Sequence, residues 1–192
     1  MRLVIIAAAA ASLLPIAATA QPKQPTRDYA ITYRMEHQGQ AGQMTVAYSA
    51  ATRRQRVEMP EAGLVVITDQ AALRMFMLNA ATRTVMEMPL AKGQEPGFVL
   101  PDDMVLTRTG SATVAGHRCT IYRAEQNRAE RGTVCMTDEG IMLRAAMRQG
   151  DLAGSMEATS LTLATQPASQ FALPEGWQVM QMPQAPGQRR QR

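Results

Sequence analysis

Turn residues interrupt this chain about every ten residues, and between the turns apolar and polar side chains alternate one by one. Between residues 28 and 37, for example, Tyr29, Ile31, Tyr33 and Met35 are separated by single residues that are mostly polar. Successive side chains of a β-strand point to opposite faces of a sheet, so a period of two is typical of a strand buried on one face. Short strands with regularly spaced turns favour an all-β sandwich or barrel.

The segments that fit a strand are 28–37, 44–48, 53–59, 64–67, 73–78, 84–88, 104–114, 117–126, 131–137, 141–148 and 156–163. We predict an all-β domain with minor α content, built as a single antiparallel meander of about ten strands that is strongly curved or forms an incomplete barrel. Residues 64–67 and 73–78 are apolar at nearly every position, and such strands are usually covered on both faces. A connector rich in proline and glycine, residues 89–101, separates the two groups of strands.

The first 20 residues have the features of a cleavable signal peptide. Arg2 precedes an apolar run, Pro15 breaks that run, and Ala18 and Ala20 are small residues at the positions that a signal peptidase reads. An uncleaved membrane anchor is the alternative, but the run is mostly alanine and contains a proline. We predict cleavage before Gln21, a linker over 21–27, a β domain over 28–183, a disordered basic tail over 184–192, and a soluble periplasmic protein with no transmembrane segment after cleavage.

Composition narrows the range of partners. Hydrophobic residues make up 46% of the chain and charged residues 19%, which is typical of a globular protein. Once Arg2 is removed with the leader, 19 basic residues face 16 acidic ones, and the three arginines among the last four residues account for the whole difference. The body of the protein is therefore close to neutral, and we expect no nucleic-acid partner.

The two cysteines, Cys119 and Cys135, are expected to form a structural disulfide. An even pair of cysteines in an exported chain favours a bridge, and the C-x-x-C spacing of a redox pair is absent. Both cysteines lie in predicted strands that flank a turn near Asn127 and Arg128, so a simple hairpin would place them directly opposite each other.

Signals of catalysis are weak. The sequence contains no nucleophile elbow, zinc-protease, Walker or dinucleotide-binding motif. His37 and His117 are each isolated, and the acid pairs at 102–103 and 138–139 lie in predicted turns, where aspartate is expected for backbone reasons. We therefore expect a protein that is not an enzyme and that needs no cofactor.

Methionine is abundant, with 15 residues, and three M-x-M pairs occur at 75–77, 86–88 and 180–182. On a strand, both members of such a pair point to the same face. Methionine is a flexible filler of cores and of adaptable apolar binding surfaces, which is the more common role. Clustered thioethers also bind Cu(I), so copper handling is an alternative interpretation.

Three stretches resemble a known family. They are 116–122 (Gly-His-Arg-Cys-Thr-Ile-Tyr), 134–143 (Val-Cys-Met-Thr-Asp-Glu-Gly-Ile-Met-Leu) and 171–177 (Phe-Ala-Leu-Pro-Glu-Gly-Trp). The chain resembles uncharacterised exported bacterial proteins, with a domain of unknown function, of the outer-membrane lipoprotein-carrier (LolA-like) superfamily. This resemblance implies an incomplete antiparallel β-barrel whose apolar concave face holds lipid or acyl chains in characterised relatives. Those carriers have a helix before the first strand, whereas residues 21–27 here are too short and contain two prolines.

We therefore expect the concave face to bind an apolar or lipid-like ligand, with two tyrosine hydroxyls as polar groups among apolar walls. The candidate lining residues are Tyr33, Met35, Val46, Tyr48, Met75, Met77 and Leu143. Two alternatives stay open. In one, the same residues pack a filled core in a structural or envelope-stress protein that binds another envelope protein. In the other, the methionine pairs handle copper; no metal site is otherwise expected.

Overall fold

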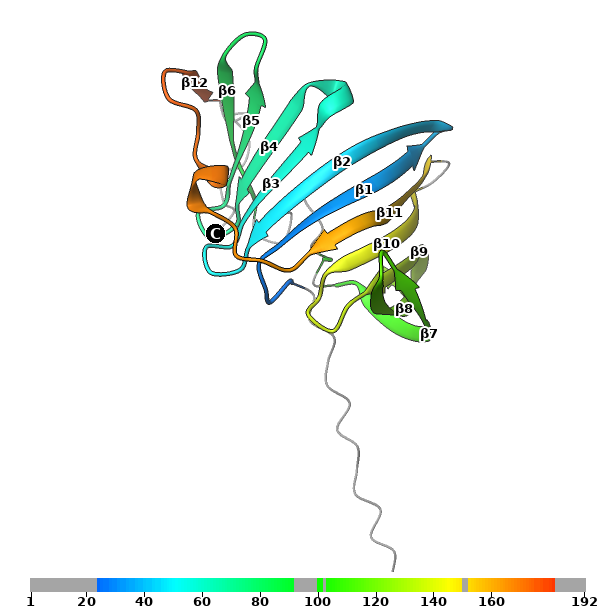
Figure 1. Ribbon diagram of the computed structural model, residues 1–192. Helices are drawn as coiled ribbons and strands as arrows, with labels where there is room; N and C mark the ends of the chain where they lie inside the picture. Colours follow the sequence, from blue (N-terminus) through cyan, green and yellow to red (C-terminus); the bar gives the residue numbers. More distant parts are fainter. Residues whose placement is uncertain (1–23, 92–99, 102, 150–151, 182–192) are drawn as a thin grey trace, which may run out of the picture.

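A computed structural model describes residues 24–91, 100–101, 103–149 and 152–181. The predicted signal peptide and the predicted basic tail lie outside the described residues. In the described part, the chain forms one twelve-stranded sheet and two short 3-10 helices. Figure 1 shows that the sheet is strongly curved, with β12 and β6 at one edge and β7 at the other.

The strands are β1 (Tyr29–His37), β2 (Gln40–Ser49), β3 (Arg54–Met59), β4 (Leu64–Asp69), β5 (Arg74–Asn79), β6 (Thr84–Pro89), β7 (Val105–Val114), β8 (His117–Gln126), β9 (Ala129–Met136), β10 (Met142–Gln149), β11 (Leu152–Thr162) and β12 (Gln178–Gln181). The 3-10 helices are η1 (Pro60–Ala62) and η2 (Ala168–Phe171). The eleven segments that the alternation marks as strands all form strands, and the all-β prediction is confirmed. Of the strands in the described part of the chain, the sequence pattern missed only β12, which has four residues.

The sheet consists of two antiparallel meanders that are joined in its middle. Its strand order is β12-β6-β5-β4-β3-β2-β1-β11-β10-β9-β8-β7. β1 pairs with β11, so the start and the end of the β domain meet at the centre. β12 adds to the edge beside β6 in the parallel sense. Because β12 and β7 remain two separate edges, the predicted incomplete barrel is confirmed as an open, curved sheet.

Two-residue turns close three of the hairpins. Gln38 and Gly39, Ala115 and Gly116, and Asn127 and Arg128 all have positive φ angles. Two consecutive residues with positive φ are the hallmark of the tight turn whose twist matches that of paired strands. The turns predicted at these positions therefore fix the local register of β1–β2, β7–β8 and β8–β9.

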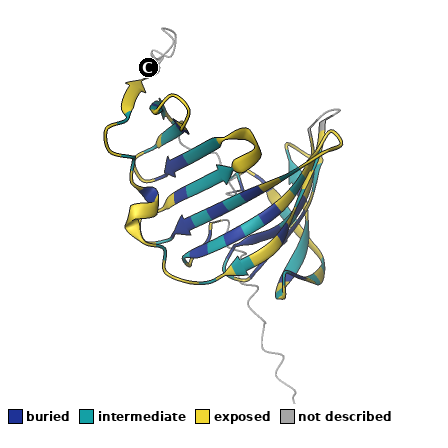
Figure 2. Cartoon of the chain, turned by 45° about the horizontal axis from the view of Figure 1, so that its top comes forward, coloured by how far each residue is buried: buried dark blue, intermediate teal, exposed yellow. Residues whose placement is uncertain are grey.

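The central core lies where the two meanders meet. Figure 2 shows buried positions alternating with less buried ones along the central strands. The first core cluster joins inward side chains of β1 and β2 to the cysteine pair and to β10 and β11; its members are Tyr29, Ile31, Tyr33, Met44, Val46, Tyr48, Val114, Cys119, Cys135, Ile141, Leu143 and Ala158. A second cluster lies under β8–β10 and includes Met104, Val134, Met136 and Met142.

The predicted disulfide between Cys119 and Cys135 is confirmed, with a Cα–Cα distance of 5.4 Å. The expected register was wrong, because Cys135 lies opposite Ile121 and not opposite Cys119. Two features shift the strands. The turn is centred between Asn127 and Arg128, and β9 contains one extra residue at a bulge opposite Ala124 and Glu125. The bridge is therefore diagonal across the hairpin, and both cysteines are buried.

β4–β6 are covered on their outer face by the segment that leads to β12. Ile67, Leu78 and Val85 are buried there against Leu173 and Trp177. On the inner face, Val66, Met75, Met77 and Met86 are only half-buried by the described residues. The expectation that these strands are covered on both faces was therefore correct for only one face. On the inner face, burial by the described residues is incomplete, so it does not by itself explain why these strands are apolar on that face too.

Candidate ligand-binding site

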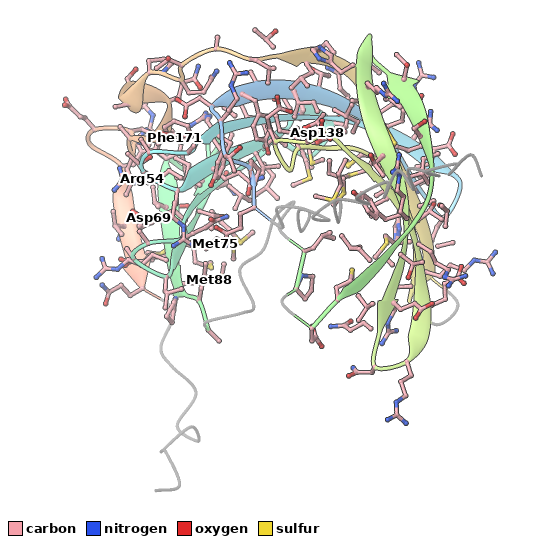
Figure 3. The ribbon with its side chains drawn as sticks, turned by 90° about the horizontal axis from the view of Figure 1, so that it is seen from below. Arg54, Asp69, Met75, Met88, Asp138 and Phe171 are labelled. Atoms are coloured by element: carbon pink, nitrogen blue, oxygen red, sulfur yellow. A yellow bond between two sulfur atoms is a disulfide. The ribbon has the colours of Figure 1, made fainter. Side chains whose placement is uncertain are left out.

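The inner side of the curve carries a continuous row of apolar side chains from β2 to β12. Residues that are paired across neighbouring strands point to the same face of a sheet. The pairing therefore places Val46, Val57, Val66, Met77, Met86 and Met180 in one row that crosses six strands. Figure 3 shows Met75 and Met88, which belong to the neighbouring row, on the inner side of the arc.

This inner face has two parts with different exposure. Near β1 and β2 the row is fully buried, with Val46 only 2% exposed. From β3 to β6, Val57, Val66, Met77 and Met86 are half-buried, and Met180 at the edge is 41% exposed. Apolar side chains that remain partly open across several strands form a surface on which a ligand or a partner can settle. We call the half-buried part over β3–β6 the open inner face.

The seven predicted lining residues fall into three environments. Tyr33, Val46, Tyr48 and Leu143 are buried in the first core cluster and pack against their neighbours. Met35 is half-buried at the border of that cluster. Met75 and Met77 lie on the open inner face. The first four residues thus form the filled floor of the concave side, and the two methionines of β5 lie on the part that a ligand can reach.

The tyrosine hydroxyls belong to the core. The Tyr33 hydroxyl donates a hydrogen bond of 2.6 Å to the backbone carbonyl of Met142, and the rings of Tyr29 and Tyr48 stack with their centroids 5.6 Å apart. Burial raises the pKa of Tyr29 and of Tyr33 well above the ordinary value. Burial also raises the pKa of Tyr48, Asp28 adds to this effect, and Arg53 opposes it. All three phenols are therefore neutral over the physiological range.

Two polar residues on the inner face were not among the site residues predicted from the sequence. Gln55 and Thr68 are each 2% exposed and lie between Tyr48 and Met75 in the same cross-strand row. Gln55 Nε2 is buried and has no hydrogen-bond partner among the described residues. Gln55 lies two residues before Val57 and four before Met59, so the alternation along a strand could have placed its side chain on the same face as theirs. Its neighbours Arg54 and Arg56 are charged, however, and they make this strand resemble one that is exposed to solvent. Gln55 supplies a hydrogen-bond donor beside the open inner face.

Members of all three M-x-M pairs lie on neighbouring strands, although they are far apart in the sequence. Met77 pairs with Met86 and Met75 with Met88, and Met86 also pairs with Met180. Met182 lies outside the described residues. No group of three or more histidine, cysteine, aspartate or glutamate side chains that could hold a metal ion occurs in the described part of the chain. The donors that the described methionines of this cluster offer a soft metal are thioether sulfur atoms.

Another hollow lies on the other side of the sheet. It has a volume of about 600 Å³ and lies on the outer face, between β1–β3, β11 and residues 166–170. Its wall is mostly polar, with Thr32, Thr45, Arg56, Glu58 and Ser160 among its residues. Such a wall does not suit an apolar ligand, so the open inner face remains the better candidate.

Comparison with known proteins assigns the family. Residues 29–147 match the family described as "Domain of unknown function (DUF4412)". The chain belongs to this family. The resemblance to uncharacterised domains that the sequence suggested is therefore confirmed. The DUF4412 match begins with β1 and ends within β10, so β11 and β12 lie beyond it. A search of curated proteins found no match.

Several solved structures share the fold. An uncharacterized conserved protein from Thermus thermophilus is 12% identical with a TM-score of 0.59, and the match covers 82% of this chain and 91% of that one. The crystal structure of MucB is 15% identical with a TM-score of 0.56, covering 81% of this chain and 60% of MucB. The chain thus spans less than two thirds of MucB. A LolA superfamily protein, NE2245 from Nitrosomonas europaea, also matches, at 7% identity and a TM-score of 0.42, covering 78% of this chain and 91% of that one.

In the part of the chain that the structure describes, no helix is long and apolar enough to cross a membrane.

Proposed function

We propose that this DUF4412 protein is a periplasmic, non-enzymatic binding protein for an apolar or lipid-like ligand. The observation that carries the proposal is the open inner face, where half-buried apolar side chains from β3–β6 line the concave side of the sheet. Burying about 100 Å² of such surface against a ligand contributes roughly 2.5 kcal/mol. An acyl chain has enough apolar surface to gain several times that amount.

The chemistry of the face supports an irregular apolar ligand. Methionine has three rotatable side-chain bonds and a polarizable sulfur, so it adapts to ligands of different shape. Four of the half-buried positions are Met75, Met77, Met86 and Met88. Gln55 lies next to them, and its buried amide nitrogen has no hydrogen-bond partner among the described residues. A few polar groups within an apolar wall are typical of small-molecule sites.

A charge substitution at Met77 tests the proposal. Because Met77 is half-buried and not fully enclosed, we expect Met77→Glu to keep a cooperative thermal transition and to abolish binding of a fluorescent fatty acid. Met77→Leu is the matched control, since it keeps the apolar volume and should bind as the wild type does. A wild-type protein that binds no fluorescent fatty acid, together with global unfolding of Met77→Glu, would overturn the proposal in favour of a filled core.

A second candidate function is the binding of another envelope protein. The fold matches that of MucB in the crystal structure of MucB in complex with MucA(peri), at 16% identity and a TM-score of 0.55, over 82% of this chain and 58% of that one. The edge strand β12 exposes Val179 and Met180, at 50% and 41%. An exposed edge can receive an added strand from a partner. This candidate gains support if the purified protein holds a defined polypeptide partner and the fatty acid does not bind.

Copper handling is the remaining alternative, and the paired methionines of β5, β6 and β12 are the observation in its favour. It separates from lipid binding on one double variant. Met77→Leu with Met86→Leu keeps the lining apolar but removes two thioethers. Stoichiometric Cu(I) uptake that this variant loses would assign the face to copper; unchanged fatty-acid binding by the variant supports the apolar ligand.

A further inference from the structure

A second hollow lies on the inner side of the sheet, at the end where β1, β8, β9, β10 and β11 reach their hairpins. Its volume is about 350 Å³. Its wall combines basic, amide and apolar side chains: His37, Met104, Gln126, Arg131, Met147 and Arg148. We call it the basic pocket. Among the described residues that line the pocket, none is acidic.

The two arginines of the basic pocket have no described acidic partner. None of the six ion pairs in the described part of the chain includes Arg131 or Arg148. The carboxylate of Asp103 lies close by, but it accepts hydrogen bonds of 3.0 and 3.1 Å from Gln126 Nε2. Arg148 also borders a neighbouring hollow that contains Glu36 and Glu130. Of the two arginines, Arg131 is therefore the one that lines the basic pocket without also lining the neighbouring hollow.

The position of Arg131 results from a bulge in β9. Ala124 pairs with Gly132 and Glu125 pairs with Glu130, so Arg131 is the extra residue without a partner across the ladder. A bulge re-aims the side chain that it carries. This geometry requires glycine at position 132. The φ angle of Gly132 is +139°, and a Cβ atom there would lie 1.9 Å from the carbonyl oxygen of Ala146 on β10.

The guanidinium of Arg131 is incompletely satisfied. Its Nε is buried and has no hydrogen-bond partner within the described part of the chain. A buried donor without an acceptor costs about 1–3 kcal/mol, and more when the group is charged. An oxygen of a bound anion would remove this cost, and arginine is well suited to carboxylate and phosphate because its N–H groups form a planar fork.

The apolar side of the pocket continues into the inner face. Met104 belongs to the second core cluster, and Met147 packs against that cluster. Met156 contacts both core clusters, and it pairs with Met35 on β1. Half-buried methionines therefore lead from the basic pocket along the inner side of the sheet. A site with a cationic end and an apolar wall matches a molecule with an anionic head and an apolar tail.

We propose that the basic pocket binds the anionic head group, a carboxylate or a phosphate, of an amphiphile whose apolar part lies along the inner face. This inference rests on the proposed function and names its ligand class. Arg131 makes the direct contact with the head group. Arg148 and His37 line the same space and add positive charge or hydrogen-bond donors.

The test compares two probes on the full mature chain. A fluorescent fatty acid and the fatty alcohol of the same chain length share the apolar tail and differ in the anionic head. We expect Arg131→Gln to weaken binding of the acid about tenfold or more and to leave binding of the alcohol unchanged. Arg128→Gln is the matched control, because Arg128 is exposed in the same hairpin and does not line the pocket. Thermal unfolding of each variant verifies the fold.

The outcomes separate this inference from the proposed function. If the wild type binds neither probe, the proposed function fails. If the wild type binds both probes and Arg131→Gln binds the acid as well as the wild type does, lipid binding stands and the head-group inference is overturned. A titration with inorganic phosphate distinguishes the two sources of the anion. Failure of phosphate to displace the acid supports an amphiphile, whereas phosphate binding that depends on Arg131, without any acid binding there, overturns it.

Discussion

At the scale of single residues, one glycine fixes both the local geometry of β9 and the direction of the Arg131 side chain. Gly132 has a φ of +139°, which side chains of L-residues rarely adopt, and the backbone of Ala146 and Met147 approaches it closely. Such close approach is possible only without a Cβ atom. The bulge that results leaves Arg131 unpaired in the ladder and places it in the basic pocket.

We predict that Gly132→Ala destabilises the protein by about 2–4 kcal/mol, because the added methyl group collides with the backbone of β10 and the φ angle becomes strained. Urea denaturation followed by circular dichroism measures the loss. Gly42→Ala is the control, since no atom lies within 4 Å of a Cβ placed there. Equal stability of the two variants would show that β9 and β10 can separate to accept the methyl group.

At the scale of elements, the local periodicity of the sequence was sufficient to locate the strands and was insufficient to pair them. The alternation of β1 and the turn residues of the hairpins are local signals, so these elements were predictable. β12 escaped because Gln178–Gln181 is short and acquires its order from a parallel partner, β6, that is remote in the sequence. The placement of β11 beside β1 depends in the same way on contacts that no local pattern contains.

The candidate site was predictable to a similar extent. The M-x-M spacing predicts that Met75 and Met77 share a face, but it does not say which face, because their strand is apolar on both sides. Alternation also assigns Tyr33 and Val46 to the inner face, but both lie in the filled centre. Alternation alone does not distinguish a covered part of a face from an open one. Gln55 and Arg131 were missed because a buried polar residue and a bulge both look like ordinary solvated positions in the sequence.

The disulfide gives the prediction that belongs to this scale. The bridge joins β8 and β9, whose hairpin faces the first core cluster, over a separation of 16 residues. We expect replacement of both cysteines by serine to cost about 2–5 kcal/mol, mainly because the unfolded chain regains freedom. Differential scanning calorimetry of the oxidised wild type and the variant measures this cost. Binding of the fluorescent fatty acid should survive, since neither cysteine lies on the open inner face; an unchanged melting temperature would contradict the prediction.

At the scale of the whole molecule, the seam between the two meanders holds the sheet together. β1 and β11 come from opposite ends of the β domain, and their pairing places Ile31 opposite Leu161. Three buried tyrosines of β1 and β2, Tyr29, Tyr33 and Tyr48, lie at this seam. Their ionisation is therefore coupled to the stability of the entire sheet, and not only to that of one hairpin.

The last prediction follows from the direction of the tyrosine pKa shifts. Burial raises the pKa of all three phenols above the ordinary value of 10.0. The native state therefore keeps phenol protons that the unfolded state has already released above about pH 10. The corresponding stability is fully present below that pH and is lost as the pH rises further, towards the folded pKa values. We expect the urea midpoint to stay constant from about pH 8 to pH 9 and to fall above about pH 10, with tyrosinate absorbance appearing together with unfolding.

Tyr33→Phe should lower stability at neutral pH by about 1 kcal/mol, through loss of the hydrogen bond to Met142, and should make the alkaline decline less steep. A decline of the same steepness in that variant would show that Tyr33 ionises without unfolding the seam.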